Sequence, residues 1–421
     1  MISFLISAIK IIFLLGFLIF IHESGHFLVA KACKIRVKEF AIGFGPTIWK
    51  KQGKETKYAL RLIPLGGFVN MIGESERSDE EGSFSKASIP KRIAVVVAGG
   101  AVNIVFGLLV YFILVSSSGN YISTTIDTIV PNYAAEQVGL RANDELLEID
   151  GKKVRLKSDI DESVQNSNGE PITLTIKREN EIKDIELTPT VEETKAIGIY
   201  LGAEENDLSG EIKSIYQDSP AEKAGIMAGD KIISVNGENP EGDPYKIVQL
   251  ISNSQTNEIV LEVERNNEIN QFNVTAETQK SYKMGVTFKI AENTFANNIY
   301  YGFWDTIDFS LSLLDNLKMM FTGNVSADQL MGPVGISEVV SKTQGIIEFI
   351  YMLALISLSL GVTNLLPFPP LDGGKVIILL IEAIRRKPLK ENVEIAIQMA
   401  GFCLLIGLSI YVTYNDILRI F

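Results

Sequence analysis

"FLISAIKIIFLLGFLIFIHESGHFLVA", residues 4–30, decides the fold class of this chain of 421 residues. A helix of about 20 apolar residues is long enough to cross the hydrocarbon core of a bilayer, and this stretch exceeds that length. It nevertheless carries His22, Glu23 and His26 near its end. An ionised side chain at membrane depth costs roughly 2 kcal/mol or more, so such residues indicate a function.

Three further apolar runs predict membrane spans, at residues 93–115, 345–375 and 393–415. Together with residues 1–30, they predict a polytopic α-helical membrane protein with four transmembrane helices. The lipid bilayer is therefore an expected partner, and no nucleic acid is expected for a chain of net charge −12.

The loops between these runs differ in charge. Residues 31–92 contain 13 Lys and Arg against 7 Asp and Glu, and residues 385–390 read "RRKPLK". Residues 116–344 contain 19 basic and 37 acidic residues. Loops rich in Lys and Arg stay in the cytoplasm, so we expect the two basic loops inside the cell. The long acidic segment and both termini are then expected outside.

The outer segment contains an internal repeat. "NYAAEQVGLRANDELLEIDG" (132–151) aligns with "DSPAEKAGIMAGDKIISVNG" (218–237) at a constant offset of 86 residues. In each copy a helix-like piece ends at Gly, and a following strand ends in Asp-Gly or Asn-Gly, a strong hairpin signal. This pattern resembles PDZ domains, which we expect at residues 121–203 and 204–290.

PDZ domains bind peptides by adding a strand to a sheet edge, while backbone N–H groups hold the terminal carboxylate. By that resemblance "AIGIYL" (196–201) is a candidate carboxylate loop, and Gly198 would let a ligand approach the backbone closely. The alternative is a pair of β-rich domains that have no ligand groove.

His22 and His26 share one face of a helix, so both can point at one metal ion while Glu23 is adjacent. They are the only two histidines in the chain. Neutral imidazoles are typical zinc ligands, and a glutamate beside them is a typical general base. The two cysteines are too few for a disulfide framework or a cysteine-based zinc site. The alternative is a polar patch that reaches the headgroups or pairs with another helix.

A catalytic zinc site usually has three protein ligands. The histidines lie late in the first span, so the third ligand should lie late in another span of the same direction. "NLLPFPPLDGGK" (364–375) closes the third predicted span, and Asp372 is its only acidic residue. Its three prolines break a helix, and broken backbone at membrane depth requires surrounding protein or a water-filled cavity. The alternative places Asp372 in the headgroup layer.

An HExxH motif in a first span and N-x-x-P-x-P-x-L-D-G in a later one resemble the site-2 protease family of intramembrane zinc metalloproteases. The tandem PDZ pattern between the second and third spans is similar to the RseP type of that family. The resemblance implies that His22, His26 and Asp372 bind Zn²⁺ and that Glu23 is the general base. Asn364 matches a family asparagine that handles substrate.

Other family segments are matched more loosely. Asn103 is a further candidate substrate-binding residue; it lies where the family usually has Gly-Pro-x-x-Asn, although this chain has glycine in place of the proline. "LIPLGGFVNMIGE" (62–74) resembles the family's membrane-reentrant β-hairpin, expected within residues 31–92, and its Gly67 and Phe68 are candidate substrate-binding residues. Within residues 291–344 we expect an amphipathic helix on the outer membrane surface; the alternative is a helix packed on the PDZ pair.

The resemblance implies a bacterial inner-membrane enzyme that cleaves peptide bonds within transmembrane segments of single-span proteins, such as anti-sigma factors and remnant signal peptides. Its active site would lie toward the cytoplasm. The PDZ domains, in the periplasm, would exclude large substrates or hold a peptide C-terminus or an adaptor. The rival hypothesis is a catalytically silent, membrane-anchored PDZ scaffold, which would not require Glu23. A serine protease is excluded because no histidine lies outside the first span.

Overall fold

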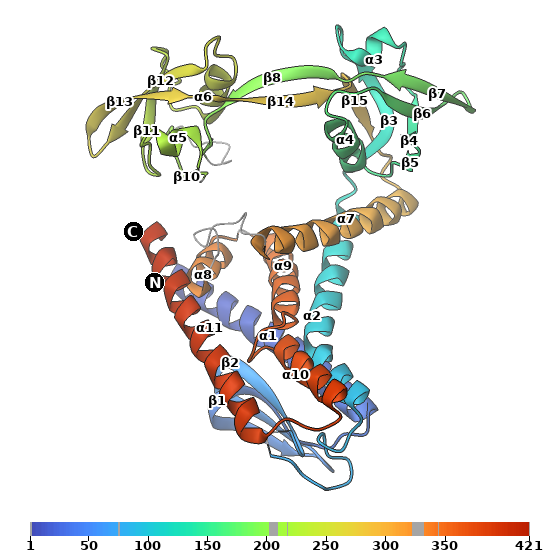
Figure 1. Ribbon diagram of the computed structural model, residues 1–421, viewed down its shortest axis with the longest axis vertical. Helices are drawn as coiled ribbons and strands as arrows, with labels where there is room; N and C mark the ends of the chain where they lie inside the picture. Colours follow the sequence, from blue (N-terminus) through green and yellow to red (C-terminus); the bar gives the residue numbers. More distant parts are fainter. Residues whose placement is uncertain are drawn as a thin grey trace. The chain divides into compact units, whose positions relative to one another are not determined.

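The computed structural model describes residues 2–74, 76–201, 209–216, 218–321, 332–343 and 345–420. The chain forms two compact units (Figure 1). Unit 1 contains Met1–Gly119 and Thr294–Phe421, and unit 2 contains Asn120–Asn293.

Unit 1 is helical. In the described part of the chain, four helices are long and apolar enough to cross a membrane. They are α1 (Ile2–Ala32), α2 (Ile89–Ser118), α9 (Ile346–Asn364) and α11 (Glu391–Ile420). The four expected spans are therefore confirmed as helices, and the chain has the fold class of a polytopic membrane protein with β-rich domains.

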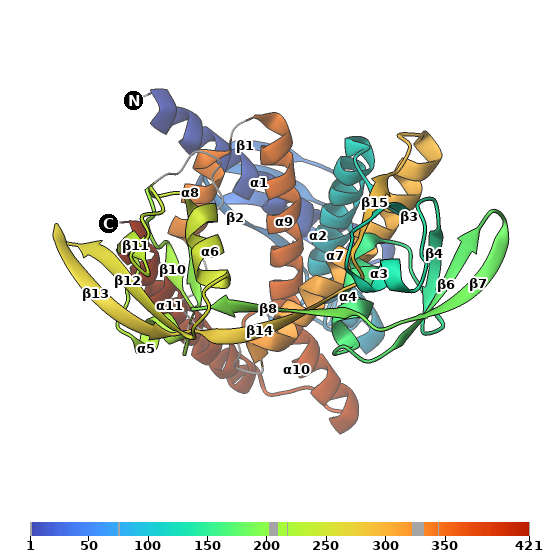
Figure 2. The same ribbon diagram turned by 90° about the horizontal axis from the view of Figure 1, so that it is seen from above.

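Small residues bring α2 and α9 together, and the two helices lie side by side in both views (Figures 1 and 2). A Cβ atom added at Gly361 would lie 2.6 Å from the carbonyl oxygen of Gly100, so neither helix could keep this distance with a larger residue there. Packing through small residues is the usual way in which membrane helices associate closely. Gly100 and Gly361 therefore hold α2 and α9 at a short distance from each other.

The third span ends earlier than the predicted range of 345–375. Helix α9 ends at Asn364, and a separate helix, α10 (Asp372–Arg385), begins at Asp372. The connecting residues include Pro367, Pro369 and Pro370. Proline lacks a backbone N–H and disfavours helical geometry in the residue before it, so the helix cannot continue through this run. Asp372 consequently lies in the first turn of a new helix.

Strands β1 (Val37–Gln52) and β2 (Lys57–Met71) form a hairpin that folds back on itself. Residues 37–42 pair with 67–71 on one side and with 57–60 on the other, while 47–52 pair with 57–61. Among the described pairings, residues 67–71 therefore have a partner on one side only. We call residues 67–71 the edge strand; their placement within a membrane remains a prediction.

Helix α7 (Phe295–Phe321) packs against α2 within unit 1. The ring of Tyr111 stacks on that of Phe309 at a centroid distance of 4.2 Å, and its hydroxyl donates to Asp305 at 3.1 Å. A short helix, α8 (Pro333–Lys342), follows. Residues 322–331 and 344 of the predicted amphipathic segment lie outside the described residues, and its position on a membrane surface remains a prediction.

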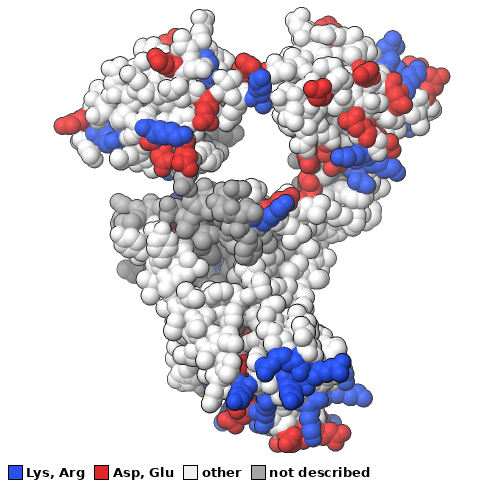
Figure 3. All heavy atoms as spheres, in the orientation of Figure 1, with Lys and Arg blue, Asp and Glu red and all other residues white. Residues whose placement is uncertain are grey.

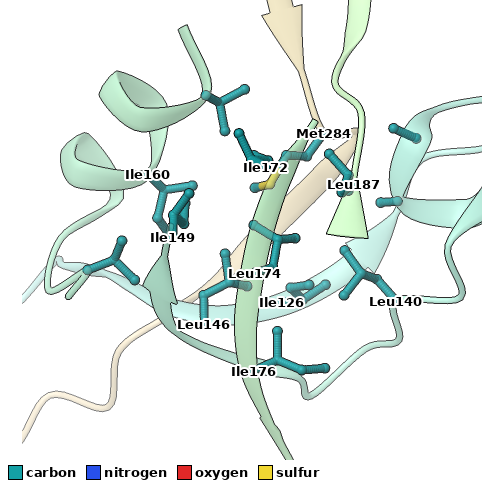
Figure 4. Close-up of a cluster of buried hydrophobic side chains, with 14 residues drawn as sticks. Ile126, Leu140, Leu146, Ile149, Ile160, Ile172, Leu174, Ile176, Leu187 and Met284 are labelled. Atoms are coloured by element: carbon teal, nitrogen blue, oxygen red, sulfur yellow. The ribbon is translucent and has the colours of Figure 1, made fainter. Parts of the chain in front are cut away.

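Unit 2 contains two hydrophobic cores. The first (Figure 4) lies in a domain made of β3 (Ile122–Ile129), α3 (Ala134–Gln137), β4 (Glu145–Ile149), β5 (Lys152–Lys153), α4 (Lys157–Asn166), β6 (Ile172–Arg178), β7 (Glu181–Leu187), β8 (Thr190–Ala196), β14 (Glu277–Lys283) and β15 (Val286–Ile290). The second is built from β9 (Ile199–Tyr200), β10 (Ser214–Ile215), α5 (Pro220–Lys223), β11 (Lys231–Val235), α6 (Pro244–Ser252), β12 (Glu258–Arg265) and β13 (Glu268–Thr275). The β8–β14 ribbon joins the two domains (Figure 1).

The two domains divide the chain differently from the predicted boundaries of 121–203 and 204–290, of which 202–208 and 217 lie outside the described residues. Strand β15 pairs with β3, and Met284 is buried in the first core. Ile197 and Leu201 are buried in the second core instead. The second domain is thus inserted between β8 and β14. The alignment of repeated segments could not reveal this, because the strand that closes the first sheet comes after the second copy.

The repeat is preserved in the contacts of the two domains. Arg178 donates to buried Asp144 at 2.7 Å, and Arg265 donates to buried Asp230 at 2.7 Å. Burial alone would raise the pKa of each aspartate, but the arginine hydrogen bonds hold it below its ordinary value. The same pair therefore fixes the same turn in both copies.

Candidate active site

Three side chains with metal-ligating atoms converge in unit 1. Nε2 of His22 lies 3.2 Å from Nε2 of His26, and each nitrogen lies 3.3 Å from Oδ2 of Asp372. The histidines project from successive turns of α1 and the aspartate from the first turn of α10. They are the only such group found among the described residues.

The donor atoms fit a zinc ion. Tetrahedral zinc with nitrogen and oxygen ligands at about 2.0–2.1 Å separates the ligand atoms by about 3.3 Å. The three observed distances are 3.2, 3.3 and 3.3 Å. Oδ2 of Asp372 is buried and has no hydrogen-bond partner among the described residues, which suits an oxygen that binds a metal ion. The set of two imidazoles and one carboxylate is also one that zinc enzymes use.

A cavity of about 430 Å³ opens beside this cluster. Glu23 and the edge strand line the cavity together with the two histidines and Asp372. A Cβ atom at Gly67 would lie 2.9 Å from Cγ of Glu23 and 2.9 Å from Cγ2 of Ile19. Glycine therefore lets the backbone of the edge strand lie directly against Glu23. Phe68 lines the same cavity.

Helix α2 holds the second histidine. Nδ1 of His26 lies 2.8 Å from the carbonyl oxygen of Val95, a contact that fixes the orientation of the ring. A Cβ atom at Gly99 would lie only 2.3 Å from Nε2 of His26, so glycine makes room for the imidazole against α2. Metal-binding histidines commonly use their second nitrogen in such a backbone contact.

The two candidate asparagines both approach His22. Nδ2 of Asn103 lies 3.5 Å and Nδ2 of Asn364 lies 3.4 Å from Nδ1 of His22. Asn364 is partly exposed, whereas Asn103 is fully buried. Neither asparagine is among the residues that line the cavity, so burial alone distinguishes them. The structure thus separates these two residues, which sequence analysis had grouped as substrate-binding.

An ion pair that sequence analysis missed lies on the cavity wall. Nζ of Lys375 lies 2.7 Å from Oε1 of Glu74 and 5.1 Å from the centre of the Phe84 ring. Lys375 follows Asp372 by one turn of α10, and Glu74 follows the edge strand. The spacing of Lys375 from Asp372 was visible in the sequence, but its partner was not.

Gly198 lies in unit 2 and not in this cavity. Its φ angle is +76°, and its carbonyl oxygen accepts a hydrogen bond from the backbone of Tyr216 at 2.9 Å. In the first domain Gly285, with φ +82°, accepts from Val130 at 2.8 Å in the same way. Sequence analysis missed Gly285, although Met-Gly-Val repeats the hydrophobic-Gly-hydrophobic pattern of Ile-Gly-Ile.

Comparison with known proteins gives a consistent family. The sequence model of "Peptidase family M50" matches residues 10–408. The regulator of sigma E protease of Haemophilus influenzae is 32% identical and covers 99% of this chain and 100% of its own length. The regulator of sigma-E protease RseP of Escherichia coli is 28% identical, with 100% of each protein covered. The solved PDZ domain of HtrA3, with a phage-derived ligand, is 22% identical over 22% of this chain and 93% of its own, at a TM-score of 0.19.

Both the family model and a relative more than 30% identical extend over nearly the whole chain. The chain belongs to peptidase family M50, the site-2 proteases.

Proposed function

We propose that this chain is an intramembrane zinc metalloprotease that hydrolyses a peptide bond within the transmembrane segment of a single-span membrane protein. The observation that carries the proposal is the triangle of His22, His26 and Asp372 donor atoms beside Glu23, on helices of membrane-spanning length. Zinc held by these three residues would supply the Lewis acidity that peptide hydrolysis needs.

Glu23 is proposed as the general base. Its carboxylate lines the same cavity as the three ligands, and the motif places it next to His22 on α1. In the reaction, this carboxylate accepts a proton from the attacking water and delivers it to the amine nitrogen as the C–N bond breaks. One residue can therefore perform both proton transfers without a second acid.

The edge strand is proposed to hold the substrate in an extended form. A transmembrane helix must unwind before its peptide bonds can be attacked, and the freed backbone groups need new partners in lipid. The edge strand, which has no described partner on its cavity side, can provide them by strand addition. Gly67 allows the approach and Phe68 offers an apolar contact, while partly exposed Asn364 is proposed to contact the substrate close to the metal.

The proposed topology places the active site toward the cytoplasm of a bacterial inner membrane. Figure 3 shows Lys and Arg side chains, together with some Asp and Glu, gathered at the lower end of unit 1, and the white surface directly above them carries few charged side chains. Arg385, Arg386 and Lys387 are exposed there. Basic residues favour the cytoplasmic side, so the acidic unit 2 and both termini are proposed to lie in the periplasm.

The two domains of unit 2 are proposed to be PDZ domains that restrict access of substrates. Gly198 and Gly285 occupy equivalent positive-φ positions at the start of the strand that a PDZ ligand would pair with. The name of the E. coli relative, regulator of sigma-E protease, favours anti-sigma-factor-like substrates, with remnant signal peptides as a second class. Peptide C-termini and an adaptor are the candidate ligands of the domains.

The testing experiment uses detergent-purified protein and a single-span substrate with a short outer tail. We expect wild type to cleave within the transmembrane segment and a zinc chelator to abolish cleavage. If wild type binds one zinc ion per chain but cleaves neither this substrate nor a set of tail-truncated ones, the silent PDZ scaffold becomes the better description.

A further inference from the structure

We propose that Asn103 is a positioning residue for the metal site: its side-chain carbonyl oxygen accepts a hydrogen bond from Nδ1–H of His22. This contact would hold His22 in the tautomer that presents Nε2 to the metal. The inference rests on the proposed zinc site and gives Asn103 a role other than the substrate binding that the family resemblance had implied.

The proton of His22 must lie on the ring nitrogen that faces away from the proposed metal. Nε2 of His22 faces Nε2 of His26 and Oδ2 of Asp372 at 3.2 and 3.3 Å. A nitrogen that binds a metal must carry a free lone pair, so the single proton of the neutral ring is on Nδ1. Nδ1–H of His22 therefore needs an acceptor, as Nδ1 of His26 already has in Val95.

Two side-chain amides lie close to Nδ1 of His22. Nδ2 of Asn103 and Nδ2 of Asn364 lie 3.5 and 3.4 Å from Nδ1 of His22, so two donors face a donor. The oxygen and nitrogen of an amide are nearly identical in shape, and their assignment follows from the hydrogen-bond network. Rotating the amide of Asn103 by half a turn places its oxygen at the site of Nδ2, where it can accept from Nδ1–H.

The two asparagines differ in burial. Oδ1 of Asn103 is buried and has no hydrogen-bond partner among the described residues. One atom of this amide lacks a partner in either orientation, but in the rotated orientation Asn103 gives His22 an acceptor. Asn103 is also fully buried and does not line the cavity, so it cannot contact a substrate there. Asn364 does not line the cavity either, but it is partly exposed, so a substrate can reach it.

Contacts between α2 and α9 hold Asn103 in place. The hydroxyl of Ser357 on α9 donates to the backbone oxygen of Asn103 at 2.9 Å. This bond lies next to the close α2–α9 contact at Gly100 and Gly361. Asn103 is thus held on the part of α2 that packs closely against α9. Residues that orient a metal ligand typically contribute a factor of about 10–100 to metal affinity.

The test measures zinc affinity of the full chain in detergent by competition with a chelator. Asn103→Leu has a similar volume but no acceptor, and we expect it to bind zinc about 10–100-fold more weakly than wild type. Asn103→Asp keeps an acceptor oxygen and should bind zinc within a few-fold of wild type. Unchanged zinc affinity in Asn103→Leu, with a loss in Asn364→Leu, would transfer the role to Asn364 and overturn the proposal.

A second readout uses the fact that the chain has only two histidines. Protein labelled with ¹⁵N-histidine, and purified without a histidine tag, should give signals from only two imidazoles. In the zinc-loaded protein, Asn103→Leu should shift the Nδ1 signal of His22 and leave that of His26 in place, and Asn103→Asp should restore it. An unchanged spectrum would overturn the proposal. Wild type that binds no zinc would instead refute the proposed function, so the two failures are distinguishable.

Discussion

Glu23 is the residue whose chemistry can be tested with the least change of structure. Glutamine has the size of glutamate but cannot accept a proton, so Glu23→Gln should retain the cavity and the three metal ligands. We expect cleavage to fall by about 10²–10⁴-fold or below detection, because general-base catalysis contributes about that factor. Zinc content by elemental analysis should remain one ion per chain. Proteolysis at the wild-type rate would refute Glu23 as the base.

Asp372 is the ligand supplied by a different helix from the histidines. Asp372→Asn keeps the shape of the side chain but removes the negative charge that attracts the zinc ion. We therefore expect zinc to be lost on dialysis against a weak chelator. The matched control is Asp315→Asn, on the exposed face of α7, which should retain zinc fully. A full equivalent of zinc in Asp372→Asn would exclude Asp372 as a ligand.

At the scale of residues, the sequence could predict what local spacing determines. The i, i+4 spacing of His22 and His26 is a property of one helix, and the structure brings them together as expected. The burial of Asn103 and the partner of Lys375 depend on contacts between distant segments. Spacing along the chain carries no information about such contacts, so sequence analysis grouped Asn103 with Asn364 and missed Glu74.

At the scale of elements, the edge strand depends on one glycine for its distance from α1. A Cβ atom at Gly67 would lie 2.9 Å from Glu23 and 3.1 Å from the carbonyl oxygen of Ala41. The strand and the helix could not both keep their places.

We therefore expect Gly67→Ala to lower kcat/KM at least about 10-fold, since small displacements in an active site have large effects on rate. Zinc affinity should stay unchanged, because the metal ligands lie on other elements. Gly407→Ala on α11, where an added Cβ meets nothing within 4 Å, is the control and should behave as wild type. Equal activity of the two variants would show that cleavage does not depend on the close approach of the edge strand to α1.

The elements themselves were predictable to different degrees. Long apolar runs predicted all four spanning helices, because span length and hydrophobicity are local properties. The prolines predicted that the third helix breaks, but not that Asp372 would begin a new helix. The extent of β1 and β2 was also not evident, since their pairing bends back on itself and leaves no simple alternation.

At the scale of the whole molecule, the insertion of one β-rich domain into another was not predictable from the repeat. The buried residues of the second core all fall between Ile197 and Ala276, and those of the first core all fall outside that interval. The repeat showed that two similar units exist. Only the pairing of β15 with β3 shows which residues complete the first of them.

The insertion makes a deletion possible that the sequential arrangement would not allow. Ala196 on β8 and Glu277 on β14 are directly paired, so the ends of the inserted segment are neighbours. Replacing residues 197–276 by Asn-Gly would join them through a two-residue hairpin turn of a favoured type. The first core would lose none of its buried residues.

We expect this shortened form of residues 120–293 to melt cooperatively, as followed by circular dichroism. The fragment 121–203 should not fold, because it lacks Met284 and β15 and leaves one side of β3 without its partner. A cooperative transition in 121–203 would show that the closing strand is dispensable. In the full chain, the same deletion should leave zinc binding intact, since all three proposed ligands lie in unit 1. If the second domain excludes large substrates, the deletion should also increase cleavage of substrates that keep a folded outer domain, relative to those with a short tail.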